Sequence, residues 1–158
     1  KPKKLLNMEI SSQIQIKSLE QISQPEWLFL WKGYQTFYEA QISEKISENT
    51  WAKLTSPGQD NMYGFAALID GKVVGLVHVV EHDSSWTMRP YAYLQDLFVH
   101  PDYRGQGVAR VLIQHVYDVA KQRNCDRVYW LTHESNHKAR LLYDKVAKKT
   151  GFIQYRMS

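Results

Sequence analysis

The stretch Arg104-Gly105-Gln106-Gly107-Val108-Ala109 lies between a run of strand-forming residues and an amphipathic helix. The run before it, residues 93–99, is mostly apolar, contains strand-forming residues such as Tyr93, Phe98 and Val99, and is followed by His100-Pro101, where a strand would stop. After it, apolar residues recur at helical spacing up to Val119. The two glycines therefore sit where a strand turns into a helix. A flexible glycine backbone at a helix N-terminus is a favourable site for a phosphate group.

Spacing separates the kinds of glycine-rich loop that bind phosphates. A Walker loop requires Gly-x-x-x-x-Gly-Lys-Ser/Thr, which this chain lacks. A dinucleotide fingerprint requires a third glycine where this chain has Arg110, and it belongs to an early βαβ unit, whereas this loop lies in the last third of the chain. The pattern that remains is Arg-x-x-Gly-x-Ala. For this stretch alone, a turn that only lets a helix pack on a strand stays open as the alternative.

A second segment adds a pattern nearer the C-terminus. Residues 127–132 read as a strand, and a helix is expected to start at Ser135 or Asn136. From Asn136 the chain reads Asn-x-x-Ala-x-x-Leu-Tyr up to Tyr143, and Gly151-Phe152 follows. With the first stretch, in this order, the segment resembles the GCN5-related N-acetyltransferase (GNAT) superfamily. It is similar to the branch whose members acetylate histones, polyamines and D-amino acids.

The resemblance implies one α/β (α+β) domain over residues 1–158. We expect residues 1–11 to be a flexible or loosely packed N-terminal segment. We expect a mixed, mostly antiparallel sheet of about six to seven strands, flanked by about four helices, with splayed strands at the acetyl-CoA site. The residues themselves predict the elements in chain order. They are a strand at 13–19, helices from Pro25 and over 44–54, a hairpin around Asp70-Gly71, a helix to Arg123, a strand through Tyr129, a helix over 136–149 and a last strand over 152–157.

Composition narrows the class of protein. The chain has 158 residues, a formal charge of +4 and a single cysteine, Cys125. One cysteine cannot form an internal disulfide, and neither a membrane-spanning run nor an apolar signal core is seen, so we expect a cytoplasmic protein. The histidines lack metal-ligand spacing, so no metal is expected. The basic residues gather in the helix near the C-terminus without a nucleic-acid motif, and a nucleic-acid-associated module is the weakest alternative.

The resemblance also assigns a cofactor site. Acetyl-CoA would pair with the strand that ends at Val99, and one amide, at Leu97 or Phe98, would polarise the thioester carbonyl. Loop amides would receive the pyrophosphate and Asn136 would hydrogen-bond the pantetheine arm. The residues assigned in this way are Leu97, Phe98, Val99, Arg104, Gly105, Gln106, Gly107, Val108, Ala109, Asn136 and Tyr143.

For catalysis, Tyr143 matches the family's general acid, which protonates the sulfur of CoA. Its alternative is a tyrosine packed on its own helix. The base is less defined, because Gln95 stands where the spermidine/spermine acetyltransferases have a glutamate in a Leu-Glu-Asp pattern, and glutamine cannot accept a proton. Asp96 ranks first and Glu134 second, and a structural Asp96 is nearly as good an interpretation. Glu81, His82 and bulk water are further possibilities.

Aromatic residues together with carboxylates suit a cationic amine, and the residues predicted to contact the substrate are Trp31, Tyr34, Glu81, Trp86 and Glu134. Core packing is the alternative for the aromatic stripe of the first helix. The resemblance therefore implies an acetyl-CoA-dependent N-acetyltransferase, and because the similar branch tends to form dimers or tetramers, we expect a homodimer. A primary amine of a polyamine, an amino acid or a basic peptide would attack directly in a ternary complex. A non-catalytic acetyl-CoA-binding regulatory protein is the alternative, which Gln95 favours.

Overall fold

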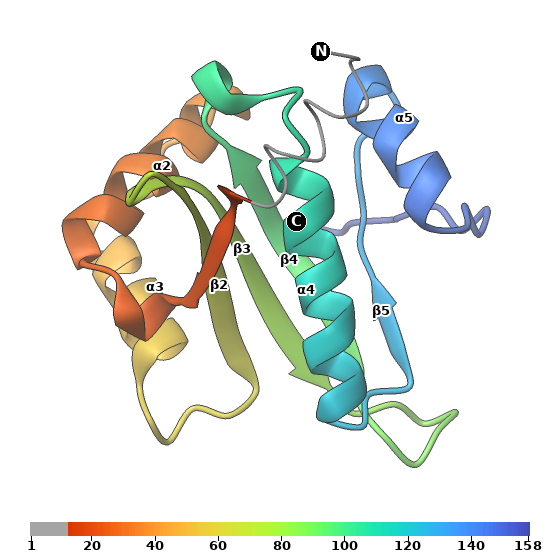
Figure 1. The fold of residues 1–158 in the computed structure, drawn as a ribbon. Helices are drawn as coiled ribbons and strands as arrows, with labels where there is room; N and C mark the ends of the chain where they lie inside the picture. Colours follow the sequence, from red (N-terminus) through yellow and green to blue (C-terminus); the bar gives the residue numbers. More distant parts are fainter. Residues whose placement is uncertain (1–12) are drawn as a thin grey trace.

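The structure is a computed structural model that describes residues 13–158, so the segment expected to be flexible, 1–11, lies outside it. Figure 1 shows the elements along the chain. They are β1 (Gln15–Ser18), the 3₁₀ turn η1 (Leu19–Gln21), α2 (Gln24–Phe37), α3 (Glu44–Thr55), β2 (Met62–Ile69), β3 (Lys72–His82), β4 (Tyr91–Val99), the 3₁₀ turn η2 (Pro101–Tyr103), α4 (Val108–Gln122), β5 (Arg127–Tyr129) and α5 (His137–Val146).

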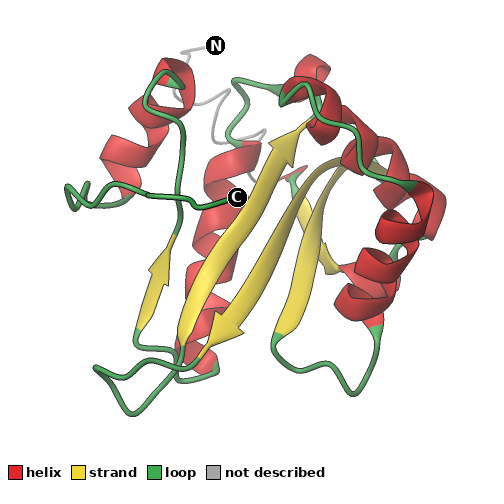
Figure 2. Cartoon of the chain, turned by 180° about the vertical axis from the view of Figure 1, so that it is seen from behind, coloured by secondary structure: helices red, strands yellow, loops and turns green. Residues whose placement is uncertain are grey.

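The strands form one sheet in the order β1-β2-β3-β4-β5, in which only β4 and β5 are parallel (Figure 2). This mixed, mostly antiparallel sheet with four α-helices within residues 13–158 confirms the predicted fold class. The β2–β3 hairpin also forms as expected. Asp70 and Gly71 both have positive φ angles, 50° and 75°, as a tight two-residue hairpin turn requires.

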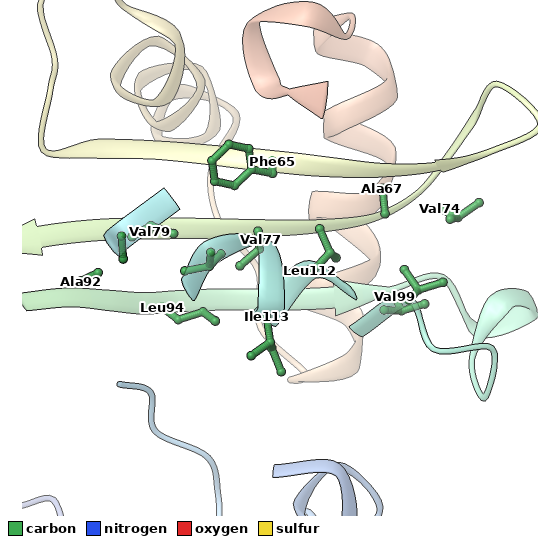
Figure 3. Close-up of a cluster of buried hydrophobic side chains, with 13 residues drawn as sticks. Phe65, Ala67, Val74, Val77, Val79, Ala92, Leu94, Val99, Leu112 and Ile113 are labelled. Carbon is green, nitrogen blue, oxygen red and sulfur yellow. The ribbon is translucent and has the colours of Figure 1, made fainter. Parts of the chain in front are cut away.

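Helices cover both faces of the sheet, and the alternation of strand residues builds a core on each side (Figure 1). On β2, Ala67 belongs to the cluster under α4, whereas its neighbours Ala66 and Leu68 belong to the cluster under α2 and α3. Figure 3 shows the first cluster, where Leu112 of α4 packs between strand residues. Burial of a leucine of this kind stabilises the fold by about 1.5–3 kcal/mol.

The start of α2 is fixed by local hydrogen bonds. Ser23 accepts a hydrogen bond from the backbone N–H of Glu26, and the Glu26 carboxylate accepts one from the backbone N–H of Ser23 at 3.0 Å. Pro25 lies in the first turn, where it costs no helical hydrogen bond, as predicted. This capping box sets where the aromatic stripe of α2 meets the sheet.

The C-terminal prediction needs correction, and with it the strand count, which is five within residues 13–158. Helix α5 ends at Val146 instead of Lys149, and residues 147–158 have no regular secondary structure. The strand expected over 152–157 is not formed, although its residues alternate in polarity from Ile153 to Met157. Phe152, Ile153 and Tyr155 are 91%, 75% and 88% exposed. A strand is stable only when it pairs with another, and in this single chain the segment finds none among the described residues.

No helix in the described part of the chain is both long and apolar enough to cross a bilayer. The cytoplasmic location and the single domain over the whole chain remain predictions.

Candidate active site

Strand β4 contains a bulge in the middle of the sheet. Asp96 is paired with His78 of β3, but Val79 is paired with Leu94, so Gln95 is an extra residue without an opposite partner. The extra residue reverses which face the following side chains take. Leu94 belongs to the core under α4, whereas Phe98 belongs to the core under α2 and α3. The bulge therefore turns Asp96 toward α2.

Beyond the bulge, β4 has one free edge. Strand β5 pairs with β4 only from Tyr91 to Tyr93, and after Tyr129 the two chain segments diverge (Figure 2). Between Leu94 and Val99, β4 is bonded to β3 on one side and has no strand neighbour on the other among the described residues. This is the predicted splay. It leaves outward-pointing backbone N–H and C=O groups that an extended ligand can pair with.

The glycine-rich loop follows this free edge and leads into α4. Gly105 and Gly107 have φ angles of 77° and 86°, which L side chains rarely adopt, and Gly107 is the N-cap. The N-cap makes no side-chain hydrogen bond within the described structure, so the first N–H groups of α4 remain available to an anion. At Gly75 of β3, a Cβ atom would lie 3.0 Å from Val108 Cγ1, so a glycine there lets the start of α4 approach the sheet closely.

Arg104 has a different surrounding from the one expected of a phosphate-binding side chain. Its Nε donates a hydrogen bond to the carbonyl of Val99 at 3.0 Å, and its guanidinium lies 5.4 Å from the ring centroids of both Phe37 and Phe98. The side chain therefore ties the loop to the ends of α2 and β4. Among loop residues, the backbone offers the more direct anion contacts.

Tyr143 and Asn136 belong to α5 and its N-cap, which follow β5 in the chain. The Tyr143 ring packs edge-on against Trp130 at 5.4 Å, and burial raises the pKa of its phenol, so the hydroxyl stays protonated. Asn136 is the N-cap of α5 and its Nδ2 donates to Thr132 Oγ1 at 3.1 Å. A narrow cleft lies between β4 and the segment that follows β5. It is lined by Tyr34, Tyr38, Leu94, Gln95, Leu97, Trp130, Leu131, Thr132 and Tyr143.

Asp96 lies beside this cleft. Its Oδ2 is 3.0 Å from His78 Nδ1, and its side chain keeps 15% of its surface exposed. The pKa of the neighbouring Tyr34 phenol is raised, first by burial and then by the charge of the Asp96 carboxylate. The side-chain partner of Asp96 is thus His78. The alternative interpretation from the sequence was a structural carboxylate bonded to neighbouring backbone.

The profile of the acetyltransferase (GNAT) family matches residues 16–147. The chain belongs to the GNAT family. This GNAT protein is 34% identical to the D-amino-acid N-acetyltransferase HPA3 of Saccharomyces cerevisiae over 157 residues, which cover 98% of this chain and 94% of the relative. It is 29% identical to the thialysine N-epsilon-acetyltransferase of Caenorhabditis elegans over 115 residues, 69% of this chain and 71% of the relative. It is therefore an N-acetyltransferase.

Solved structures agree with the fold of this GNAT enzyme. The aminoglycoside acetyltransferase AAC(6')-Iy in complex with a CoA-containing bisubstrate analog superposes with a TM-score of 0.78 at 19% identity, covering 92% of this chain and 97% of that chain. The ribosomal-protein-alanine N-acetyltransferase from Brucella melitensis gives a TM-score of 0.70 at 21% identity, covering 92% and 97%. At this identity, the likeness shows the fold alone.

The structure separates the residues predicted to contact the substrate. Tyr34 lines the cleft, whereas Trp31 is only 6% exposed and donates a hydrogen bond from Nε1 to Ser47 Oγ at 3.1 Å. Trp31 therefore packs in the core, which was its alternative interpretation. Trp86 is 90% exposed in the loop between β3 and β4, and Glu134 is exposed in the loop after β5.

Glu81 and His82, both proposed from sequence as possible bases, lie at the other end of β3. Glu81 pairs with Arg123 at the end of α4, and His82 Nε2 lies 2.6 Å from the hydroxyl of Tyr129. They line a separate, open cleft away from the free edge of β4. The structure therefore does not bring them together with Tyr143 or Asp96.

Sequence reasoning missed His78, Trp27 and Tyr38. His78 is the only polar residue in the apolar run 73–80, and an imidazole in such a run is the signal that could have marked it. Trp27 and Tyr38 were considered only as parts of the aromatic stripe of the first helix, and His78 only as a possible metal ligand. Within residues 13–158, no group of three or more His, Cys, Asp or Glu side chains is placed to hold a metal ion. The expectation of no metal stays a prediction.

Proposed function

We propose that this enzyme transfers an acetyl group from acetyl-CoA directly to a primary amine while both substrates are bound. The observation that carries the proposal is the free edge of β4, which runs from the cleft at Tyr143 to the open N-terminus of α4. An extended ligand with an anionic group at one end fits these two features together. Acetyl-CoA supplies an acyl group activated as a thioester.

Three parts of the chain would hold this ligand. The outward amides and carbonyls of β4 beyond Leu94 would pair with the amide-rich pantetheine arm, in the way that a peptide strand adds to a sheet edge. The first N–H groups of α4, after Gly107, would receive the pyrophosphate. One β4 amide, at Leu97 or Phe98, would donate a hydrogen bond to the carbonyl oxygen, which gains negative charge during attack.

Asp96 and Tyr143 are the proposed base and acid. An amine must be neutral to attack, and most amines are ammonium ions at neutral pH, so a carboxylate near the cleft both attracts the cation and accepts its proton. Tyr143 stays protonated because burial raises the pKa of its phenol. It can donate its proton to the departing thiolate, whose basicity also rises in a site shielded from water.

The acceptor is proposed to be a small molecule with a primary amine, and an amino acid is the first candidate. The cleft is narrow and carries the phenol rings of Tyr34, Tyr38 and Tyr143, which offer aromatic faces and hydroxyl groups to a cation. Among the relatives, one is named for D-amino acids and one for thialysine, both small amines. Polyamines and basic peptides are the other classes of acceptor to be tested.

The experiment is a thiol-release assay with acetyl-CoA and a panel of D- and L-amino acids, thialysine, polyamines and a basic peptide. We expect release that depends on the amine, and intersecting lines when both substrate concentrations are varied. Parallel lines would instead indicate an acetyl-enzyme intermediate. Tight binding of acetyl-CoA without release on any amine would contradict the proposal and favour a regulatory protein.

We also propose that the enzyme forms a homodimer through its C-terminal segment. The exposed side chains of Phe152, Ile153, Tyr155 and Met157 form an apolar stretch of a size that isolated chains rarely leave in water. Light scattering should give the mass of a dimer for the full chain and of a monomer for a chain that ends at Lys149. A monomeric full chain at micromolar concentration would contradict this proposal.

A further inference from the structure

His78 lies in the middle of β3, 2% exposed, between the apolar Val77 and Val79. An imidazole buried in this way is costly unless its nitrogens find partners. Trp27 Nε1 lies 3.0 Å from His78 Nε2, and Asp96 Oδ2 lies 3.0 Å from His78 Nδ1. Side chains from α2, β3 and β4 therefore form one continuous set of hydrogen bonds, which we call the Trp27–His78–Asp96 chain.

The direction of these hydrogen bonds is fixed by the indole. Trp27 Nε1 can only donate, so His78 Nε2 must accept and carries no hydrogen. The single ring hydrogen of neutral His78 is then on Nδ1, from which it is donated to the Asp96 carboxylate. A second ring hydrogen on Nε2 would point directly at the indole N–H. His78 is therefore a donor to Asp96 and cannot accept a proton without breaking its bond to Trp27.

The surroundings keep the Trp27–His78–Asp96 chain rigid. Trp27 is fully buried, and its ring centroid lies 5.7 Å from that of Trp31 and 5.1 Å from that of Trp51. At Gly64 of β2, a Cβ atom would lie 2.5 Å from the Val77 carbonyl oxygen and 3.3 Å from His78 Cδ2. A side chain there would push against the strand that carries the imidazole. The ring thus has little room to turn over.

We propose that Trp27 and His78 are positioning residues that hold the Asp96 carboxylate, in one orientation, as the group that meets the substrate amine. The inference rests on the proposed role of Asp96. Its order is the reverse of a Ser-His-Asp triad, where the carboxylate is the buried member and the imidazole meets the reactant. Here a donor-only indole is the buried member and the carboxylate faces outward. Because His78 is a neutral donor, Asp96 keeps its full charge for a cationic amine.

The first test needs no variant. Ring ¹⁵N spectra of the wild-type enzyme at a pH where histidine is neutral should show His78 protonated on Nδ1 and unprotonated on Nε2. Trp27→Phe removes the indole donor, so the ring should keep its Nδ1 hydrogen through Asp96, and only the Nε2 signal should change as it loses its hydrogen bond. A wild-type ring protonated on Nε2 would overturn the proposal, because neither hydrogen bond could then have the assigned direction.

The second test compares two replacements of His78. In His78→Asn the side-chain amide can occupy the place of Nδ1 and donate to Asp96, whereas His78→Leu has no donor. We expect His78→Leu to lower kcat/KM for the amine about tenfold, the cost typical of one lost hydrogen bond to a charge, with KM for acetyl-CoA unchanged. His78→Asn should restore most of this loss. Equal losses in two folded variants would assign His78 to packing only and overturn the proposal.

A matched control and a separate reference complete the design. His115 of α4 packs edge-on against Phe65 at 4.5 Å on the opposite face of the sheet, and His115→Gln should leave kcat/KM unchanged. The role of Asp96 itself is tested by Asp96→Asn. Full activity of Asp96→Asn would contradict the proposed function, whereas an inactive Asp96→Asn with a fully active His78→Leu would contradict only the inference about positioning.

Discussion

Two polar clusters lie along β3, each with one carboxylate, and the two clusters are built differently. At one end, Glu81 is paired with the guanidinium of Arg123, which also donates a hydrogen bond to the carbonyl of Asp60. Near the middle, Asp96 is bonded to His78, a neutral donor held by Trp27. Glu81 is paired with a guanidinium, which carries a permanent charge, whereas Asp96 is paired with an imidazole that the proposed hydrogen-bond directions make a neutral donor. This difference indicates which carboxylate is free to act on a cation.

The largest expected effect comes from removing the charge of Asp96. Asp96→Asn keeps the shape of the side chain but cannot accept a proton, so kcat/KM for the amine should fall about a thousandfold, within the range typical of proton transfer to a positioned group. Steady-state kinetics would measure this, and isothermal titration should show that acetyl-CoA binds as before. A loss below threefold would place the base elsewhere.

Tyr143→Phe tests the proposed proton donor, which lines the cleft. Removal of the hydroxyl should lower kcat about a hundredfold without changing acetyl-CoA affinity, because the proposed proton transfer occurs only after the complex has formed. The ring can still pack on Trp130, so the melting temperature serves as the control. Unchanged turnover would remove Tyr143 from the mechanism.

The reactivity of Cys125 tests the cluster that contains Glu81 and Arg123. Its pKa is raised to about 11, first by burial and then by the negative charge of Glu81. At pH 8 the thiolate should therefore be roughly a hundredfold scarcer than in a thiol of pKa 9, and the greater nucleophilicity of the more basic thiolate offsets part of this. We expect alkylation by iodoacetamide about tenfold slower than for free cysteine, rising with pH up to about 11. Reaction as fast as free cysteine would show that this cluster is open to water.

Glu81→Gln should have the smallest effect, and on stability alone. The carboxylate is only 9% exposed, so loss of its charge leaves Arg123 with a weaker partner, at a cost of about 1 kcal/mol. Urea unfolding would measure this change, and kcat should stay as in the wild type. A fall in kcat without a change in stability would break the comparison between the two carboxylates.

The sequence predicted the parts of the site that depend on local pattern. The loop from Arg104 to Ala109, the Asp70-Gly71 hairpin and the start of α2, predicted at Pro25 and found at Gln24, all follow from turn and capping preferences of residues close in the chain. It also ranked Asp96 first as the base, although without its partner His78.

The rest depends on which strand residues lie opposite each other. Glu81 and Asp96 lie on the two neighbouring strands β3 and β4. Only the register of these strands shows that Asp96 lies opposite His78 and that Glu81 lies opposite Ala92. The bulge at Gln95 has no local signature in the residues around it. The strand expected at 152–157 has the right alternation, but alternation shows only that a segment can pair, not that a partner is within reach.

At the bulge, the presence of an extra residue in β4 matters in a different way from the identity of its side chain. Gln95 is exposed, so many side chains would be accommodated there. Deletion of the residue would remove the bulge, because Leu94 and Asp96 would then follow each other opposite Val79 and His78, and the later positions of β4 would keep their faces. The opposite holds if Gln95 took a regular place in the ladder: every later position would then exchange faces, and the carboxylate of Asp96 would enter the hydrocarbon layer beneath α4. The failure of residue 95 to pair, more than the chemistry of its side chain, keeps the charge on the side of α2.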